Sequence, residues 1–200
     1  EDRVRGWPRR AYFAAFLREL RATEPRRALV LIGPRRVGKT VMLMQAVQHL
    51  LDAGIVGTQI LYAQMDAPLF VGDSLDSLVR RFVALHRHEP TRPLWVLFDE
   101  IQYLKDWQTH LKVLVDTHRQ VRIVATGSAA AALKMGSRES GAGRFSDFVL
   151  PPLTFAEYLD FSGRESLIVE TADDGLARLR YDTPNIGELN AEFLNYLNYG

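Results

Sequence analysis

The sequence predicts an α/β fold, a three-layer αβα sandwich in which helices cover both faces of a parallel five-stranded sheet. Apolar runs typical of strands that are buried on both faces recur along the chain. Segments with helical spacing of apolar residues follow these runs, and strands that alternate with helices pair in parallel. The 200 residues, 47% of them hydrophobic, can bury the core that such a domain needs.

The first strand is predicted at residues 28–32 (ALVLI), and GPRRVGKT follows it at residues 33–40. This pattern is typical of a phosphate-binding loop, in which two glycines adopt positive φ and let the backbone approach phosphate oxygens. Lys39 can reach the β- and γ-phosphates, and the Thr40 hydroxyl can ligate Mg²⁺. The residues predicted to bind the nucleotide are Gly33, Pro34, Arg35, Arg36, Val37, Gly38, Lys39, Thr40 and Val41.

Helical spacing follows the loop. Leu43, Val47, Leu50 and Leu51 lie at the intervals of one helix face, so a helix is predicted to begin at Lys39. The positive end of its dipole adds to the attraction for phosphate. The alternative interpretation is a glycine-rich turn with an incidental lysine.

An acidic pair, Asp99 and Glu100, follows the apolar run at residues 94–98 (LWVLF). Ligands of parallel sheets bind at the carboxyl ends of the strands. We therefore expect Asp99 to hold Mg²⁺, directly or through water, and Glu100 to polarise the water that attacks the γ-phosphate. Alternatively, the pair only caps the helix that follows.

A third strand is predicted at residues 121–128 (VRIVATGS), and it ends in small polar groups. Nucleotide-hydrolysing folds of this class place a polar side chain here, where it contacts the γ-phosphate or the attacking water. Thr126 and Ser128 are both candidates, and their spacing does not separate them. The alternative role for either is a turn and the N-cap of a helix at residues 129–133.

The remaining elements follow from the same patterns. They are a strand at 59–65, helices at 75–83 and 107–115, a strand at 148–150 stopped by two prolines, a helix capped by Thr154, and a last helix carrying Leu189, Phe193, Tyr196 and Leu197 on one side.

The strings GPRRVGKT, LFDEIQYLKDW, IVATGS and GAGRFSDFVLPPLTFAEYL together resemble the predicted AAA+ superfamily ATPases of bacteria and archaea, over residues 10–162. The resemblance implies the strand order 5-1-4-3-2, ATP or ADP with Mg²⁺ as cofactors, and a C-terminal domain of poorly defined function after the ATPase core. Beyond the phosphate loop and the strand ends, the shared positions are Ile101, Gln102, Trp107, Gly143, Arg144, Pro152, Leu153, Phe155, Glu157 and Tyr158.

Arg144 is a further catalytic candidate, because AAA+ assemblies often complete each active site with an arginine from the neighbouring subunit. It lies in a glycine-rich loop before the last strand of the core. An arginine that reaches the γ-phosphate stabilises the charge of the transition state. The alternative is a local ion pair, for example with Asp147, and Arg138 is the second candidate for the role in trans.

The predicted organisation has three parts, namely a basic arm and helix at 1–22, the ATPase core at 23–163, and a linker with the helical start of a truncated lid or C-terminal domain at 164–200. Arg178 and Arg180 are available as the arginine that a complete lid brings to the nucleotide. Because the resemblance implies that such a chain continues into a further C-terminal domain, we expect a fragment of a longer protein, and the absence of a starting methionine suggests that the true N-terminus is missing or processed.

The formal net charge of +1 conceals an asymmetry. The first fifty residues carry eleven lysines and arginines against four acidic residues, and the last fifty carry three against nine. A basic arm with Arg3, Arg5, Arg9 and Arg10 can attract DNA, or it is only a solvated surface, since no aromatic-interleaved basic stripe accompanies it. Oppositely charged ends also favour head-to-tail contact in a homo-oligomer.

The chain contains no cysteine, which excludes disulfides and thiolate metal sites and fits a cytoplasmic protein. No apolar run approaches the roughly 18 residues that a membrane span needs, and no signal peptide is visible, so no membrane partner is expected.

We therefore expect a Mg²⁺-dependent ATPase whose hydrolysis step moves a C-terminal domain or a subunit interface. The first alternative is a nucleotide-dependent switch that hydrolyses slowly or not at all and binds DNA or a protein partner. The second is a P-loop kinase or GTPase. No Asn-Lys-x-Asp or Thr-Lys-x-Asp string is present to read guanine, and Glu100 stands where a kinase needs an acceptor site.

Overall fold

The structure is a computed structural model, and it describes residues 4–22, 24, 26–70, 72–128, 143–171 and 180–199. The chain is divided into two compact units, Glu1–Pro151 and Pro152–Gly200. The predicted core extends to residue 163, whereas the first unit of the structure ends at Pro151.

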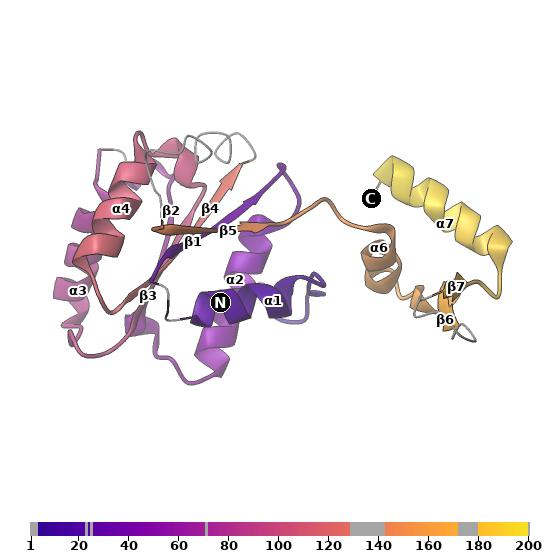
Figure 1. Ribbon diagram of the computed structural model, residues 1–200, viewed down its shortest axis with the longest axis horizontal. Coiled ribbons are helices and arrows are strands. Elements are labelled where there is room, and N and C mark those ends of the chain that lie inside the picture. Colours follow the sequence, from indigo (N-terminus) through magenta and orange to yellow (C-terminus); the bar gives the residue numbers. More distant parts are fainter. Residues whose placement is uncertain are drawn as a thin grey trace. The chain divides into compact units, whose positions relative to one another are not determined.

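A parallel sheet forms the centre of the first unit (Figure 1). Its strands are β1 (Ala28–Gly33), β2 (Ile60–Gln64), β3 (Leu94–Asp99), β4 (Val121–Ser128) and β5 (Phe145–Val149). Every neighbouring pair is parallel, and the order is β2-β3-β4-β1-β5. This is the predicted order 5-1-4-3-2 read from the other edge, so the predicted fold class is confirmed.

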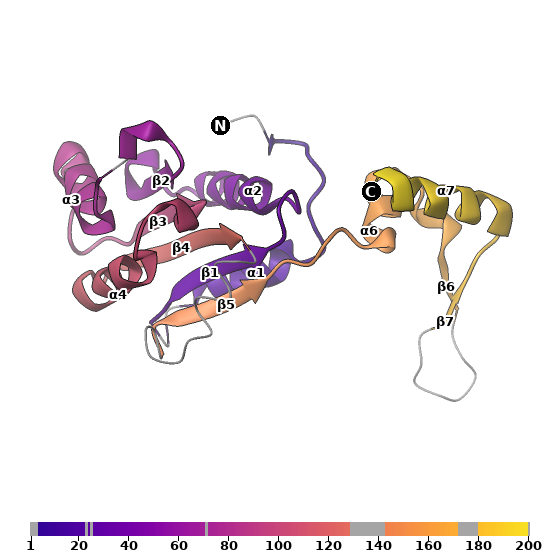
Figure 2. The same ribbon diagram turned by 90° about the horizontal axis from the view of Figure 1, so that it is seen from above.

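Helices cover both faces of this sheet. Figure 2 shows α2 and α4 on opposite sides of β4. Helices α1 (Phe13–Arg21) and α2 (Lys39–Asp52) pack on one face, and α3 (Leu75–His86) and α4 (Trp107–Thr117) pack on the other.

Alternation along β1 explains why its sequence is apolar throughout. Leu29 and Leu31 belong to the hydrophobic cluster beneath α1 and α2. Val30 and Ile32 point the other way, into the cluster formed with α3 and α4. Because both faces are buried, a polar side chain on either face would lack a hydrogen-bonding partner. Strand β1 contains no polar side chain.

The predicted helices begin where their sequence signals lie. Helix α2 begins at Lys39, as predicted, directly after Gly38 in the left-handed region. Helix α3 is capped by Ser74, whose hydroxyl accepts a hydrogen bond from Ser77 N at 3.1 Å. In α4, the four positions with predicted helical spacing are all buried, namely Trp107, Leu111, Leu114 and Val115.

Two element boundaries differ from the prediction. Strand β5 begins at Phe145, three residues before the predicted start at Phe148, because its polar residues Ser146 and Asp147 hide the strand pattern. The predicted strand at 59–65 begins at Ile60, after a short 3₁₀ turn at Gly57–Gln59. The helix expected at 129–133 lies outside the described residues.

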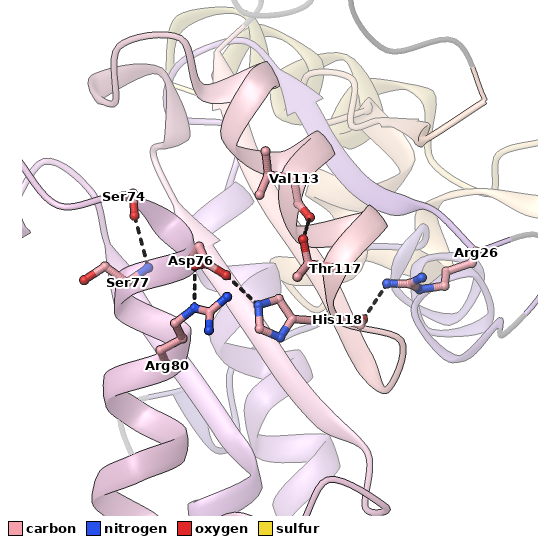
Figure 3. Close-up of polar contacts among 8 residues, drawn as sticks. All are labelled: Arg26, Ser74, Asp76, Ser77, Arg80, Val113, Thr117 and His118. Atoms are coloured by element: carbon pink, nitrogen blue, oxygen red, sulfur yellow. Dashed lines mark hydrogen bonds and ion pairs between the residues drawn. The ribbon is translucent and has the colours of Figure 1, made fainter.

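Polar contacts join α3, α4 and the segment before β1 at the amino ends of the strands (Figure 3). The carboxylate of Asp76 in α3 accepts a hydrogen bond from Arg80 Nε at 2.6 Å and lies 2.7 Å from Nε2 of His118. Arg26 Nη2 in turn donates to the His118 carbonyl oxygen at 2.5 Å. These contacts hold the edge of the sheet opposite the phosphate loop.

The second unit contains α6 (Phe155–Phe161), β6 (Val169–Thr171), β7 (Arg180–Asp182) and α7 (Ile186–Tyr199). Thr154 caps α6 as predicted, and Glu157 completes a capping box by accepting from Thr154 N. Strands β6 and β7 form an antiparallel pair inside the stretch predicted to be a linker. None of the helices in the described ranges of the chain has the length and apolar character that crossing a bilayer requires.

Candidate functional site

The parallel sheet brings three predicted site segments to one edge. Gly33 at the end of β1 is the register partner of Ser128 at the end of β4. Phe98 in β3 is the register partner of Ala125 in β4, so Asp99 lies beside Thr126. Residues that are far apart in sequence therefore meet at the carboxyl ends of neighbouring strands, where parallel sheets bind ligands.

The two glycines of the phosphate loop have different reasons to be glycine. Gly38 has φ of 92° and precedes α2. Gly33 does not have positive φ, so that part of the prediction is wrong. A Cβ on Gly33 would lie 2.4 Å from Leu150 O, so this position must be glycine for the chain after β5 to pass. Arg36 is instead the second loop residue with positive φ, at 65°.

Lys39 is 5% exposed, and its ammonium group lies among loop carbonyls. Its Nζ donates to Gly33 O at 3.1 Å and to Pro34 O at 2.7 Å. Burial lowers the pKa of Lys39, and the nearby carboxylates of Glu100 and Asp99 act in the opposite direction. The lysine therefore lies close enough to the acidic pair for an electrostatic attraction between them.

Asp99 is 1% exposed, and hydrogen bonds hold both of its carboxylate oxygens. Oδ1 accepts from Thr126 Oγ1 at 2.5 Å, and Oδ2 accepts from the Tyr62 hydroxyl at 3.1 Å. Burial raises the pKa of Tyr62, and the charge of Asp99 raises it further, so this phenol stays a donor. The two bonds fix the orientation of the carboxylate.

Thr126 connects the two acidic residues. Its hydroxyl donates to Asp99 and accepts from Glu100 N at 2.9 Å, and the residue is 0% exposed. Both hydrogen-bonding roles of this hydroxyl are thus directed at the acidic pair. Ser128 lies two residues further on, beside the start of the phosphate loop.

Glu100 adopts the left-handed conformation, with φ of 54°. A non-glycine residue pays about 1 kcal/mol for this backbone, which makes the position notable as a functional candidate. Gln102 donates from Nε2 to Glu100 Oε2 and accepts from Ser128 N at 3.3 Å through Oε1. Gln102 therefore bridges the end of β3 and the end of β4.

A cavity of about 610 Å³ is lined by Arg35, Arg36 and Glu100. This volume lies within the range of small-molecule sites, roughly 300–1,000 Å³. The two guanidinium groups on its walls suit the phosphates of a ligand, and the carboxylate suits an attacking water. The buried carboxylate of Asp99 and the Thr40 hydroxyl are hard oxygen donors, which fit Mg²⁺.

The structure does not bring Arg144 to this cavity in its own chain. Arg144 precedes β5, at the amino ends of the strands, whereas the phosphate loop begins at the carboxyl end of β1. The length of β1, about 20 Å at roughly 3.3 Å per residue, separates the two. Its Nε lies 2.8 Å from Asp116 Oδ1 and 3.0 Å from Oδ2. The ion pair is local, as the alternative prediction has it, but its partner is Asp116 rather than Asp147.

Three other arginine candidates lie outside the described residues of the first unit. Arg138 and Arg178 lie outside the described residues. Arg180 begins β7 in the second unit. A role for Arg144 in trans, or for a lid arginine, stays a prediction.

Sequence reasoning missed Tyr62 and the bridging role of Gln102. A tyrosine in a buried strand needs a partner for its hydroxyl, which is the signal that could have drawn attention to Tyr62. Gln102 was recognised only as a shared position in a motif. Its bridge depends on the turn at Glu100, which spacing along the chain does not reveal.

The sequence model of one family, described as an AAA domain, matches residues 25–159. An uncharacterized protein of Haemophilus influenzae is 32% identical over 135 residues, which cover 65% of this chain and 32% of that protein. The uncharacterized protein MJ1637 of Methanocaldococcus jannaschii is 34% identical over 135 residues, covering 66% and 27%. This chain thus spans about a third or less of the curated relatives it matches.

Solved structures resemble the fold. The crystal structure of Saccharomyces cerevisiae RIF2 has a TM-score of 0.51 and 16% identity, with 92% of this chain and 67% of that chain covered. A DNA replication initiation factor has a TM-score of 0.49 and 14% identity, with 81% and 53% covered. At such low identity the likeness to RIF2 concerns the fold alone.

Proposed function

Because the chain belongs to the AAA domain family, we propose that its first unit binds ATP with Mg²⁺ and hydrolyses it to ADP and phosphate. The family match confirms the AAA+ resemblance predicted from the motifs, and it supports a nucleotide-binding function of the ATPase type. The proposal rests on one observation above all. Thr126 holds Asp99 and Glu100 at the edge where the phosphate loop lies.

Phosphate binding is assigned to the loop at residues 33–40. Its backbone N–H groups and the start of α2 attract the phosphates, and Lys39 adds a positive charge for the β- and γ-phosphates. Arg35 and Arg36 contribute further positive charge on the cavity wall. Mg²⁺ bound at this site would neutralise negative charge on the phosphate oxygens.

The Thr40 hydroxyl and the Asp99 carboxylate are assigned to hold the metal. Tyr62 and Thr126 each donate to one oxygen of Asp99, so they fix the orientation of this carboxylate. Each oxygen keeps a lone pair with which it would hold Mg²⁺, directly or through water. Loss of either donor would let the carboxylate rotate.

Glu100 is assigned to accept a proton from the attacking water. Gln102 holds one oxygen of this carboxylate, and its other end binds Ser128 N. Ser128 lies beside Gly33, whereas the Thr126 hydroxyl is already bonded to the acidic pair. We therefore assign the contact with the γ-phosphate to Ser128 and a positioning role to Thr126.

Phosphate release from ATP and from GTP, measured with Mg²⁺ and with EDTA across protein concentrations, tests the proposal. We expect release from ATP that requires Mg²⁺ and disappears in Lys39→Ala, while the exposed Lys112→Ala retains it. ATP binding without release would favour the alternative, a nucleotide-dependent switch that binds DNA or a protein partner. Failure to bind ATP would overturn the proposal.

Coupling to a moving part is also proposed. Hydrolysis in this class of site can bias a domain or a subunit interface. The candidates for the moving part are the second unit, a homo-oligomer interface, or a region of the longer relatives that this chain does not cover. A rise of turnover with protein concentration would favour an interface. A cytoplasmic location likewise stays a proposal, which the absence of cysteine supports.

A further inference from the structure

Arg10 is a buried cation that the roles assigned above do not use. It lies just before α1, and only 8% of its surface is exposed. Its Nη1 donates to Val37 O at 2.7 Å, and its Nη2 donates to Pro151 O at 3.0 Å. Burying a guanidinium costs much free energy unless protein acceptors replace its hydrogen bonds to water. These two contacts therefore determine where the side chain lies.

The first acceptor belongs to the phosphate loop. Val37 precedes Gly38, and in a trans peptide the carbonyl and the following N–H point in opposite directions across one plane. When Arg10 holds Val37 O, the N–H of Gly38 must therefore point away from Arg10. Gly38 has φ of 92°, and a glycine there has no side chain to restrict the rotation of this peptide.

The second acceptor belongs to the segment that follows β5. Leu150 N donates to Ile32 O at 2.7 Å, and Leu150 O passes so close to Gly33 that no Cβ fits there. This segment therefore lies against the start of the phosphate loop. Arg10 joins its next residue, Pro151, to the far side of the loop at Val37.

We propose that Arg10 is a positioning residue of the phosphate loop, which orients the Val37–Gly38 peptide toward the nucleotide phosphates and locks the loop against the segment after β5. Arg10 does not touch the nucleotide. The inference rests on the proposed binding of ATP, and it assigns the buried arginine of the basic arm to phosphate affinity rather than to DNA.

The test compares Arg10→Gln with Arg9→Gln in the same chain. Both substitutions remove one positive charge, but Arg9 is exposed and its guanidinium lies over the ring of Phe13. We expect Arg10→Gln to weaken the binding of ATP and ADP, measured by calorimetry, by about tenfold or more, as the loss of charge-assisted hydrogen bonds predicts. Arg9→Gln should change the dissociation constants by no more than about twofold.

The amide resonance of Gly38 separates positioning from a general loss of stability. We expect ADP to shift this resonance strongly in the unsubstituted chain and in Arg9→Gln, and only weakly in Arg10→Gln at saturating ADP. Arg10→Lys keeps the charge but cannot span both carbonyls, so its affinity for ADP should lie between those of Arg10→Gln and the unsubstituted chain. If Arg10→Gln does not fold, Arg10→Lys carries the test with the same two measurements.

Equal affinities of the Arg10 and Arg9 variants would overturn the inference. So would a weakened variant in which the Gly38 resonance still responds fully to ADP, because Arg10 would then only hold the N-terminal arm in place. Neither result affects the proposed function, because ATP binding and phosphate release by the unsubstituted chain test it separately.

Discussion

The Thr126 hydroxyl donates a hydrogen bond to Asp99 Oδ1 over 2.5 Å, and both residues are almost wholly buried. The same hydroxyl accepts a hydrogen bond from Glu100 N at 2.9 Å. One side chain of β4 therefore positions two acidic residues at the end of β3. In a buried site, such a network fixes geometry, and removal of one member leaves the atoms bonded to it without that hydrogen bond.

Thr126→Val should test this network. Valine keeps the shape of threonine but leaves a buried carboxylate oxygen of Asp99 and the partly buried N–H of Glu100 without their partner, so we expect a loss of about 1–3 kcal/mol in the free energy of unfolding and a lower turnover. Urea denaturation and phosphate release measure the two effects. Thr126→Ser should retain most of both, and Thr117→Val, at an exposed threonine, serves as the control. Normal stability and turnover in Thr126→Val would contradict the assigned role.

Gly33→Ala should destabilise the first unit. The new Cβ would lie 2.4 Å from Leu150 O, a backbone atom that cannot move alone, so we expect a loss of about 1–3 kcal/mol in the free energy of unfolding. Gly57→Ala is the matched control, because nothing lies within 4 Å of a Cβ at that position and its φ is not positive. If the two variants unfold at the same urea concentration, the close approach of Leu150 is not as described.

Asp76 should make stability depend on pH in the acid range. The hydrogen bond from Arg80 is the main cause that lowers the pKa of Asp76, and His118 contributes to it. A carboxyl whose pKa is lowered on folding stabilises the protein above its unfolded pKa, near 3.9, and this contribution is lost as pH falls through the folded value. We expect Asp76→Asn to cost about 1 kcal/mol near pH 6, and less and less as pH falls below about 4. A difference in the free energy of unfolding that does not vary with pH would contradict this account.

Arg144→Gln should leave the turnover of dilute protein unchanged. Arg144 is paired with Asp116 at the edge of the sheet opposite the phosphate loop, so it does not reach the site of its own chain. Turnover should be measured over a wide range of protein concentration. A loss that appears only at high concentration would support the predicted role in trans. A loss of about tenfold or more at the lowest concentration would contradict the placement described here.

Much of this architecture was predictable because local patterns determine it. The apolar runs around Val30 and Val96 are buried on both faces, and the spacing of Trp107, Leu111 and Leu114 defines the buried face of α4. The phosphate loop and the acidic pair were found from residue types at fixed offsets. Their meeting at one edge follows from the parallel sheet alone.

The parts that escaped prediction depend on contacts between distant segments. The hydroxyl of Tyr62 in β2 reaches Asp99 in the neighbouring strand β3, and Arg10, near the start of the first unit, reaches Pro151 at its end. The reason for glycine at position 33 lies in Leu150. Spacing also could not separate Thr126 from Ser128, whereas the structure gives them different surroundings. Thr126 is bonded to the acidic pair, and Ser128 is the register partner of Gly33.

Glu100→Gln tests the central claim most directly, with phosphate release and ATP affinity measured on the same preparation. Glutamine keeps the size of the side chain but cannot accept the proton of the attacking water. The account predicts that release with saturating ATP and Mg²⁺ falls by about a hundredfold or more, while the dissociation constant for ATP stays within a few fold. Release that continues at the original rate would show that Glu100 does not activate water, and the assignment of this site would be wrong.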